Sequence, residues 1–457
     1  MKNKFLFLTA LFILICSGTF AQNVAATIAA PKVDTGDTAW VMFSAALVLL
    51  MTIPGLAIFY GGLVRRKNVL SVLMQCFITT AVVSIEWVIC GYSLSFSHSE
   101  SILSPFIGGF DWAFLNGIGI NDLSPYFISH SQLLADGTRT GTIPHLTFIM
   151  FQCMFAVITP ALLIGAFTER INFKGFLMFT ILWSIFVYNP VAHWTWSSDG
   201  WLFKMGILDF AGGTVVEINA GIAALVTAIM LGRRRDYKDH ALPPHNIPLV
   251  VIGAALLWFG WFGFNAGSGL AADGLAGNAF LTTHLAAAIA ALLWGTLEWI
   301  EGKKPTTVGV CTGAVAGMVA ITPAAGFVNI AGALIIGTAA TMICFVMVAF
   351  AKPKLRYDDS LDVFGIHGVA GIIGTILTGI LATPTVQAAY SGAVYGNMNQ
   401  LSVQLVGVLA TIAFSAIGTA LMFFITDKTV GMRAPDKQEA QGLDESQHGE
   451  TAYTTFD

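Results

Sequence analysis

Two apolar segments of the sequence each carry one ionisable residue at the same relative position. The segments read DFAGGTVVEINAGI from Asp209 and DSLDVFGIHGVAGI from Asp359, and Glu217 and His367 each lie eight residues after their aspartate. Ionisable residues inside apolar spans are costly and usually functional. A carboxylate and an imidazole can each accept and release a proton, so both are candidate functional residues of a buried site. The alternative for each residue is a structural hydrogen bond to a neighbouring helix.

The composition indicates what kind of element must position these residues. Of the 457 residues, 56% are hydrophobic and 11% are charged, whereas a soluble domain carries roughly 25% charged residues. A soluble core cannot bury that much apolar surface, so we expect an all-α polytopic membrane protein. Helices are favoured over a barrel because the apolar runs are continuous and do not alternate.

Eleven apolar runs approach or exceed the length of about 20 residues that a transmembrane helix needs. The predicted spans are 38–62, 69–97, 144–167, 174–196, 208–232, 247–270, 277–300, 306–323, 329–351, 361–382 and 402–426. The six cysteines lie inside these apolar runs without metal-ligand spacing, and we interpret them as packing residues.

The N-terminus predicts a secretory signal peptide over 1–21, because two lysines precede an apolar run that ends at the small residue Ala21. With the mature N-terminus outside, most lysines and arginines fall in the inner loops, which predicts an N-out, C-in topology. The predicted domains are the signal peptide, a transmembrane domain over 22–427 (helices 1–5 at about 38–232, helices 6–10 at about 247–382, helix 11 at about 402–426) and a cytoplasmic tail over 428–457.

The matched segments predict an internal repeat with an offset of 150 residues, which carries the fifth helix onto the tenth. Because each half has five helices, an odd number, the halves have opposite orientation and form an inverted repeat. Eight residues of helix rise about 12 Å, close to half of a hydrocarbon core of about 30 Å. Glu217 and His367 are therefore expected to meet near the midplane. Asp209 and Asp359 are expected at helix N-termini, where a carboxylate accepts backbone N–H groups. The alternative is a chance match, since Ala, Gly and Ile are abundant.

Longer motifs resemble the Amt/Mep/Rh ammonium transporter family, and they cover nearly the whole mature chain in order. They are DFAGGTVV (209–216) with the downstream GRRR (232–235), TIPGLAIFYGGLVRRKNVL (52–70), FQCMFAVITPALLIGAFTERI (151–171), WFGFNAGS (261–268), FGIHGVAGIIG (364–374) and the tail GMRAPDKQEAQGLDESQHGETAY (431–453). The resemblance implies an ammonium transporter or channel.

The resemblance also implies a recruitment site at the outer mouth of the pore. Phe155 and Phe264 match the pair of stacked aromatic residues that gate the mouth. Trp196 and Ser268 match two positions of the recruitment site, and Phe155 completes its aromatic cup. Aromatic faces attract a partly desolvated cation, and a serine hydroxyl can accept a hydrogen bond from it.

Deeper in the pore, His367 matches the second histidine of the family's twin-histidine pair, and Asp209 matches an aspartate near the mouth. Glu217 is a departure, because it stands where most members have the first histidine; a glutamate there resembles a variant of fungal Mep members. The expected mechanism is that ammonium loses a proton near the mouth, ammonia crosses an apolar pore, and Glu217 and His367 relay the proton. Net uptake is then electrogenic.

The alternatives to this function are an electroneutral Rh-like channel for ammonia or carbon dioxide, and an ammonium sensor whose transport is incidental. An intramembrane metalloprotease built from His284, His367 and Glu217 is disfavoured because the sequence has no H-E-x-x-H motif. We therefore expect no enzyme activity, metal or cofactor.

The resemblance implies several partners and a location. The expected substrate is ammonium, with methylammonium as an analogue, and the expected assembly is a homotrimer in a bacterial inner membrane. The tail resembles the family's regulatory C-terminus, which implies docking of a PII-type signal protein at the cytoplasmic face. No nucleic-acid partner is expected.

Three further polar residues fall in apolar runs without an assigned function. Glu86 is an intramembrane acid whose partner the sequence does not identify. His193, near the outer end of the fourth helix, is interpreted as structural. His284, in the middle of the seventh helix, is expected to be a buried core histidine with its hydrogen bonds satisfied.

Overall fold

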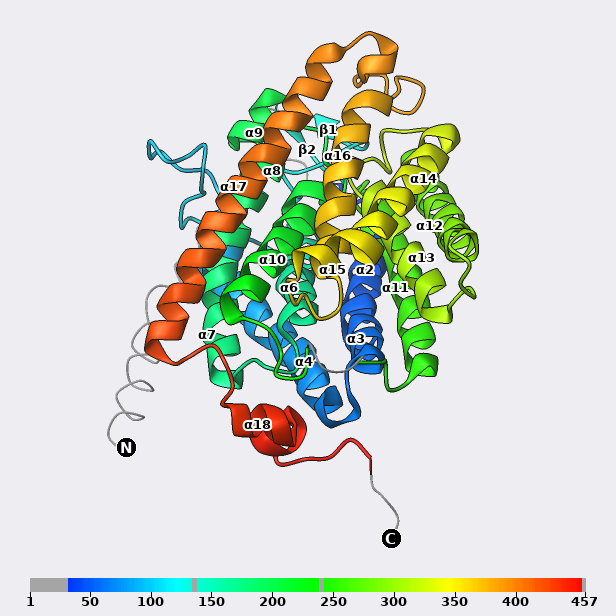
Figure 1. The fold of residues 1–457 in the computed structure, drawn as a ribbon. Helices are drawn as coiled ribbons and strands as arrows, with labels where there is room; N and C mark the ends of the chain where they lie inside the picture. The colour runs from blue at the N-terminus through cyan, green and yellow to red at the C-terminus, as the bar shows by residue number, and fades with distance from the viewer. Residues whose placement is uncertain (1–31, 134–137, 238–241, 454–457) are drawn as a thin grey trace, which may run out of the picture. The chain divides into compact units, whose positions relative to one another are not determined.

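The structure, a computed structural model, describes residues 32–133, 138–237 and 242–453 (Figure 1). The predicted signal peptide over 1–21 lies outside the described residues. The helical elements, with η marking 3-10 and π-helical turns, are α2 (Thr35–Leu50), η1 (Met51–Leu56), α3 (Ala57–Leu63), η2 (Arg66–Asn68), α4 (Val69–Glu86), η3 (Trp87–Gly91), α5 (Tyr92–Phe96), η4 (Ala113–Leu115), α6 (His145–Phe167), α7 (Phe173–Trp183), η5 (Ser184–Tyr188), α8 (Asn189–Trp196), α9 (Trp201–Met205), η6 (Gly213–Ile218), α10 (Asn219–Leu231), α11 (Ile247–Gly267), α12 (Gly274–Ile300), α13 (Thr307–Ile321), α14 (Ile330–Val346), η7 (Met347–Ala351), α15 (Lys352–Leu355), η8 (Phe364–Gly368), α16 (Val369–Leu381), η9 (Ala393–Tyr395), α17 (Met398–Thr429), α18 (Asp436–Gln441) and η10 (Asp444–His448).

Ten continuous helices among the described residues are long and apolar enough to cross a membrane. They are Thr35–Leu63, Arg66–Phe96, His145–Phe167, Phe173–Met205, Gly213–Leu231, Ile247–Gly267, Gly274–Ile300, Ile330–Leu355, Phe364–Leu381 and Met398–Thr429. The predicted all-helical polytopic membrane fold is thereby confirmed. The remaining predicted span, 306–323, holds α13, an apolar helix of 15 residues. A short antiparallel hairpin of β1 (Gln132–Leu133) and β2 (Arg139–Thr140) lies in the loop between α5 and α6.

Several of these long helices contain a π-helical turn, where the regular hydrogen-bond ladder is interrupted. In η1 the cause is local: Pro54 has no N–H to donate, and Ile53 leaves the helical region with φ −129° and ψ 113°. The turns η6 and η8 stand at the start of their helices and carry Glu217 and His367. Single π-helical turns inside helices are frequent at functional sites.

The centre of the bundle is built around α6. All of its residues except Leu146 and Met150 are buried, so this helix is surrounded by protein on nearly every side. Its neighbours in the bundle include α2, α4 and α10. In Figure 1, α10 lies next to the long diagonal helix α17, with which it is in contact.

The helices α10 and α16 are a matched pair. Each has 13 residues, and the bounds of α16 follow those of α10 at an offset of 150 residues. They pack antiparallel, since Glu217 lies against Gly371 while Gly221, four residues later, lies against Gly368. A side-chain carbon at Gly221 would collide with the backbone of Gly368. The absence of a side chain at Gly221 and Gly371 thus allows the two helices to come into close contact.

The C-terminal tail packs on one end of the bundle, which we call the tail side; the opposite end, where the loop between α5 and α6 lies, is the loop side. On the tail side, Asp444 accepts hydrogen bonds from the backbone N–H groups of Leu70 (3.0 Å) and Ser71 (2.8 Å) in the first turn of α4. Glu439 accepts from the backbone N–H of Arg235 at 2.6 Å. The carboxylates of the tail therefore bind backbone N–H groups of the body.

A buried ion-pair network also lies on the tail side, next to the ends of α6 and α10. The Arg234 guanidinium bonds Glu169 at 3.0 Å and Asp358 at 2.8 Å, and Arg65 bonds Glu169 at 3.1 Å. Although burial alone would raise the pKa of Glu169, Arg234 and Arg65 hold that pKa below its ordinary value. The network joins the segment after α10 to the segment before η8.

Candidate functional site

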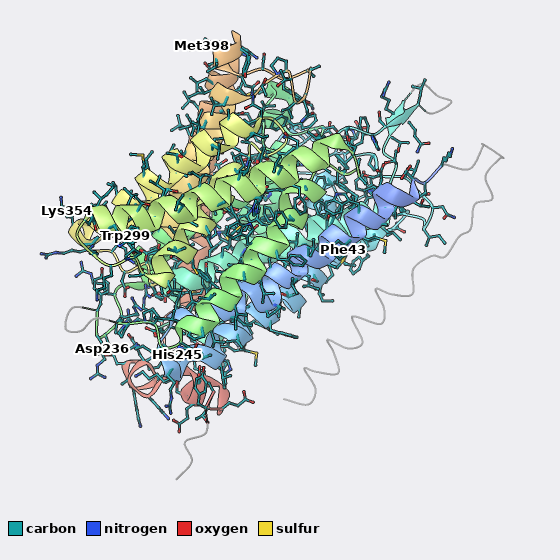
Figure 2. All side chains as sticks on the ribbon, turned by 90° about the vertical axis from the view of Figure 1, so that its right-hand side faces the viewer. Phe43, Asp236, His245, Trp299, Lys354 and Met398 are labelled. Atoms are coloured by element: carbon teal, nitrogen blue, oxygen red, sulfur yellow. The ribbon has the colours of Figure 1, made fainter. Side chains whose placement is uncertain are left out.

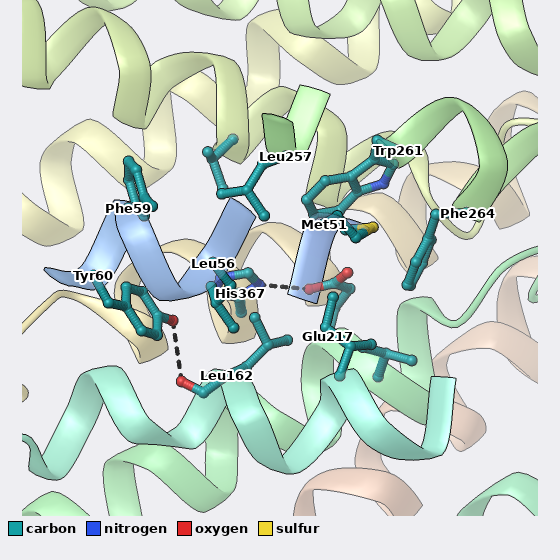
Figure 3. A pocket seen from close by; sticks show the side chains of 13 residues that line it. Met51, Leu56, Phe59, Tyr60, Leu162, Glu217, Leu257, Trp261, Phe264 and His367 are labelled. Atoms are coloured by element: carbon teal, nitrogen blue, oxygen red, sulfur yellow. Dashed lines mark hydrogen bonds and ion pairs between the residues drawn. The ribbon is translucent and has the colours of Figure 1, made fainter. Parts of the chain in front are cut away.

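Glu217 and His367 are in contact. The Nδ1 atom of His367 lies 2.7 Å from Oε2 of Glu217, and their side chains are 6% and 1% exposed. Figure 3 shows the two side chains pointing toward each other inside a pocket. The two matched π-helical turns, η6 and η8, supply one member each. A proton can pass between a carboxylate and an imidazole at this distance.

The pocket around the pair is small and almost entirely apolar. Its volume is about 10 Å³, about the space that one water molecule needs. Its lining residues are Met51, Leu56, Phe59, Tyr60, Ile158, Leu162, Val216, Glu217, Leu257, Trp261, Phe264, Val315 and His367.

The other polar groups of this lining are occupied within the protein. The Tyr60 hydroxyl donates to the carbonyl of Leu162 at 3.1 Å, and the Trp261 indole N–H donates to the Thr322 hydroxyl at 2.9 Å. The carboxyl and imidazole groups of the pair are therefore the proton-handling groups of the pocket. Such an apolar passage can admit a small neutral molecule, while the carboxyl and imidazole groups can carry a proton separately.

A second, larger cavity continues the passage toward the tail side. It has a volume of about 200 Å³ and shares Phe59, Tyr60, Val315 and His367 with the central pocket. Ser360 and other polar residues join its lining. Because His367 lines both cavities, it lies where the narrow apolar part of the passage meets the wider part.

Two buried phenylalanines close the other end of the central pocket. The ring centroids of Phe155 and Phe264 are 4.4 Å apart with an interplanar angle of 38°, and both side chains are about 1% exposed. Phe264 also lines the pocket. The rings of Trp196 and Phe155 meet edge to face, with centroids 5.6 Å apart. The three aromatic residues form a continuous plug between the pocket and the loop side.

Hydrogen bonds to main-chain carbonyls hold the residues around this plug. Trp196 donates from Nε1 to the carbonyl of Asp209 at 3.0 Å, and Ser268 donates from Oγ to the carbonyl of Phe264 at 2.8 Å. Ser268 is thus linked to the plug through the backbone of Phe264. The structure brings together Phe155, Phe264 and Trp196 directly, and it places Ser268 one helical turn away from Phe264.

The two matched aspartates both bind the start of a π-helical turn, but to different degrees. Asp209 accepts backbone N–H groups from Gly212 (2.8 Å), Gly213 (2.6 Å) and Thr214 (2.8 Å). Asp359 accepts the N–H of Phe364 at 2.8 Å through Oδ2, while its buried Oδ1 has no hydrogen-bond partner. Both carboxylate oxygens of Asp209 therefore accept hydrogen bonds from the start of η6. At η8, only one carboxylate oxygen of Asp359 does so.

Two residues of the central lining, Tyr60 and Trp261, were not among the predicted site residues. The sequence carried a signal for both, because each lies in a segment that matches a family motif. What the motif did not reveal is the orientation of the rings. That orientation depends on hydrogen bonds to Leu162 and Thr322, which lie on other helices.

The three unassigned polar residues have different surroundings. Glu86 accepts a hydrogen bond from Asn189 of α8 at 2.9 Å, which supplies the partner that the sequence did not identify. His193 is buried, with its ring nitrogens 3.0 Å from the Ser95 carbonyl and 2.7 Å from the Ser104 carbonyl, as expected for a structural histidine. The prediction for His284 is wrong, because its side chain is exposed, beside Trp258. The helix α12 presents one face outward, and an apolar run does not reveal which face that is.

Comparison with known proteins assigns this architecture to a family. Residues 39–453 match the model of the Ammonium Transporter Family. The chain is 49% identical over 424 residues to an ammonium transporter of Aquifex aeolicus (92% of this chain, 94% of the relative) and 48% identical over 419 residues to one of Bacillus subtilis (92% and 98%). The crystal structure of Saccharomyces cerevisiae Mep2 superposes with a TM-score of 0.78 at 35% identity, covering 88% of each chain. The members of the family are transporters rather than enzymes, and this chain belongs to the ammonium transporter family.

Proposed function

We propose that the protein takes up ammonium by separating it into ammonia and a proton that cross the same passage by different means. Ammonium is recruited on the loop side by Phe155, Trp196 and Ser268, and it loses its proton at the Phe155–Phe264 gate. The observation that carries the proposal is the Glu217–His367 contact, which lies in an apolar pocket directly behind that gate.

Selectivity over potassium follows from the apolar lining. A low dielectric disfavours the charged form of an amine by up to about 3–5 pKa units when it is fully buried. Ammonium can respond by releasing its proton, whereas potassium has no neutral form. Ammonia then passes the narrow pocket, whose volume of about 10 Å³ suits a molecule of its size.

The proton is carried by the pair, in which Glu217 takes the position that the first histidine of the twin-histidine pair has in most members. Each ammonium ion gives up one N–H bond at the gate, and the freed proton is bound first on the loop-side member, Glu217, and then on His367. On the tail side the proton leaves His367 and combines with the lone pair of ammonia to form ammonium again. One positive charge crosses per ammonium ion, so uptake is electrogenic.

We propose an N-out, C-in topology with eleven transmembrane helices, in which α13 is the eighth. Helices 1–5 (about 38–232) and 6–10 (about 247–382) form inverted halves of a transmembrane domain over 22–427, and helix 11 (about 402–426) completes it. The proposal is supported by the antiparallel packing of α10 and α16 with an offset of 150 residues. In this topology the loop side is external and the tail side is cytoplasmic.

We further propose that the signal peptide 1–21 is removed, that the protein forms a homotrimer in a bacterial inner membrane, and that the tail 428–457 is regulatory. A PII-type signal protein would dock on the cytoplasmic face. The regulatory role is supported by the hydrogen bonds that join Glu439 and Asp444 of the tail to Arg235 and to the first turn of α4.

Electrical recording on proteoliposomes tests this function. Pulses of ammonium and methylammonium are expected to evoke transient inward currents, and equal pulses of potassium are expected to evoke none. A potassium current as large as the ammonium current would exclude the selective mechanism. Ammonia flux without any current would instead support the electroneutral Rh-like channel. If ammonium binds saturably but neither current nor flux is detected, the protein is a sensor.

A further inference from the structure

Three consecutive basic residues, Arg65, Arg66 and Lys67, form the loop between α3 and α4 on the tail side. They line one side of a cavity of about 610 Å³, which is separate from the transport passage. Residues of the C-terminal tail line its other side: Gln441, Asp444, Glu445, Thr451, Ala452 and Tyr453. The cavity therefore lies between the body of the protein and its tail, open on one side to solvent.

The basic side chains of this cavity have donors that no carboxylate occupies. Arg65 binds Glu169 through Nε and Asp236 through Nη1, but its buried Nη2 has no hydrogen-bond partner. The Nζ atom of Lys67 donates to neutral carbonyl groups, at 2.5 Å to that of Ala440. Arg66 is exposed, and its guanidinium lies 5.8 Å from the ring centroid of Tyr453. Neither Arg66 nor Lys67 forms an ion pair with a described residue.

The acidic residues of the lining do not neutralise this charge. The Asp444 carboxylate is buried and already accepts the N–H groups of Leu70 and Ser71. Glu445 is exposed to solvent.

Arg65 is already paired with Glu169 and Asp236. Among the described residues, Arg66 and Lys67 are therefore the two basic residues of the lining that have no carboxylate partner. The cavity thus has two basic side chains whose charge is not paired with a described carboxylate.

The tail wall of the cavity is held in place by contacts with the body. The Tyr453 hydroxyl lies 2.9 Å from Nε2 of His245, in the loop before α11, and Arg66 lies over the same ring. Figure 2 shows Asp236 and His245 at the end of the molecule where α18 lies, opposite Met398. A ligand in the cavity would touch both the basic loop and the last described residues of the tail.

We propose that this cavity binds a ligand carrying a phosphate group, which Arg66 and Lys67 hold. Phosphate oxygens accept several charge-assisted hydrogen bonds at once, and arginine presents its N–H groups in a planar fork that matches them. The phosphate can belong to a soluble compound or to the headgroup of an anionic lipid, because basic clusters at the ends of membrane helices bind such headgroups. The proposal does not depend on the transport mechanism.

Calorimetric titration of the purified full chain in neutral detergent tests this site and separates the two sources. The soluble probe is sodium pyrophosphate, and the lipid probe is dioctanoyl phosphatidylglycerol, with zwitterionic dioctanoyl phosphatidylcholine as its charge control. Saturable binding of pyrophosphate assigns a soluble ligand, and binding of phosphatidylglycerol alone assigns a lipid. The double variant Arg66→Ala with Lys67→Ala is expected to weaken that binding by about tenfold or more. The matched control, Lys303→Ala with Lys304→Ala, removes two basic residues from the loop after α12 and is expected to bind as the natural protein does.

A second pair of variants keeps the test valid if the double variant does not fold. Thr451 is exposed on the tail wall of the cavity, so Thr451→Glu adds a negative charge there, whereas Thr451→Gln adds similar bulk without charge. Thr451→Glu is expected to weaken binding, and Thr451→Gln is not. The proposal is overturned if neither pyrophosphate nor phosphatidylglycerol binds saturably. It is equally overturned if a folded double variant, or Thr451→Glu, binds the probe as tightly as the natural protein.

Discussion

Glu217 stands in contact with an imidazole inside a nearly apolar pocket. Its side chain is 1% exposed, so neither water nor lipid can solvate its charge, and His367 is the group that interacts with it most directly. At 2.7 Å the carboxylate and the imidazole can share one proton, which a relay between them requires.

Replacing Glu217 by leucine removes the carboxylate and keeps an apolar side chain of similar length. Glu217→Leu is expected to reduce the ammonium-evoked current to background in proteoliposomes while ammonia flux, followed by the internal pH, continues. Undiminished current would contradict the relay. Glu86→Gln is the matched control, since Glu86 is another buried acid but lies outside both cavities and binds Asn189. Its current should stay near that of the natural protein.

At the scale of elements, the close crossing of α10 and α16 decides where the pair meets. Gly221 lies against the backbone of Gly368, and Gly371 lies against the Cβ atom of Glu217. Small residues allow helices in membranes to approach closely, and packing contacts rather than the hydrophobic effect hold them together. A wider crossing would separate the carboxylate from the imidazole.

Gly221→Ala places a methyl group against the backbone of Gly368, and backbone cannot move aside as a side-chain end can. We expect this overpacking to destabilise the protein by about 1–3 kcal/mol, measured as a lower midpoint of thermal unfolding in detergent. Gly277→Ala is the control, because Gly277 lies in α12 with nothing within 4 Å of the added carbon. There the better helix propensity of alanine favours the variant by up to about 1 kcal/mol. Equal midpoints for the two variants would show that the crossing tolerates a wider spacing.

The loop between α5 and α6 is attached to the bundle by His130. Nδ1 of His130 lies 2.8 Å from Asp37 of α2, and Nε2 lies 3.6 Å from Asp273, the N-cap of α12. The hydrogen bond to Asp37 raises the pKa of His130, despite some opposing desolvation, and the charges of Asp37, Asp273 and Asp34 act in the same direction.

Because the pKa of His130 is raised in the folded protein, its stabilising contribution is complete below the unfolded pKa of about 6.5. This contribution is lost as the pH rises through the pKa that His130 has in the folded protein. His130→Gln is therefore expected to lower the unfolding midpoint most at pH 5.5, with the difference shrinking above pH 7, as followed by tryptophan fluorescence. Thr142→Val removes another hydrogen bond to Asp37 but keeps the histidine. The change that it causes in the unfolding midpoint should therefore not follow this pH dependence. If His130→Gln lowered the unfolding midpoint equally at every pH, protonated His130 would not be what attaches the loop to Asp37.

At the scale of the whole molecule, the tail side is where separate parts of the chain are joined. Arg234 follows α10, Asp358 precedes η8, and Glu169 follows α6; these three residues form one buried network. The tail packs beside it, since Glu439 binds the N–H of Arg235. The tail therefore packs against the same network that joins the helices carrying Glu217 and His367.

Arg234→Ala leaves Asp358 and part of Glu169 without their main partner in a buried setting. Removing one partner of a buried ion pair typically costs about 3–5 kcal/mol, so we expect a large fall in the unfolding midpoint. The control is Lys303→Ala, which breaks the pair with Glu301 in which Lys303 is 65% exposed; exposed pairs contribute about 0–1 kcal/mol. An effect of Arg234→Ala no larger than that of the control would show that the network does not stabilise the fold.

The sequence alone determined the helical membrane fold, because long apolar runs have few stable alternatives in a bilayer. The spacing in the two matched segments indicated Glu217 and His367 as partners, and their side chains lie 2.7 Å apart in the structure. The spacing was informative because Glu217 and His367 occupy corresponding turns of two matched helices. The offset of 150 residues that relates the helices therefore also relates the two residues.

Only the tertiary structure decided which helix faces meet. It identified Asn189 as the partner of Glu86 and exposed His284. It also placed the basic loop of Arg65, Arg66 and Lys67 opposite the tail, with a cavity between them. In a helix that is apolar all round, the sequence pattern does not distinguish the face that packs against protein from the face that does not. That choice is made by the shapes of neighbouring helices, which are distant in the chain.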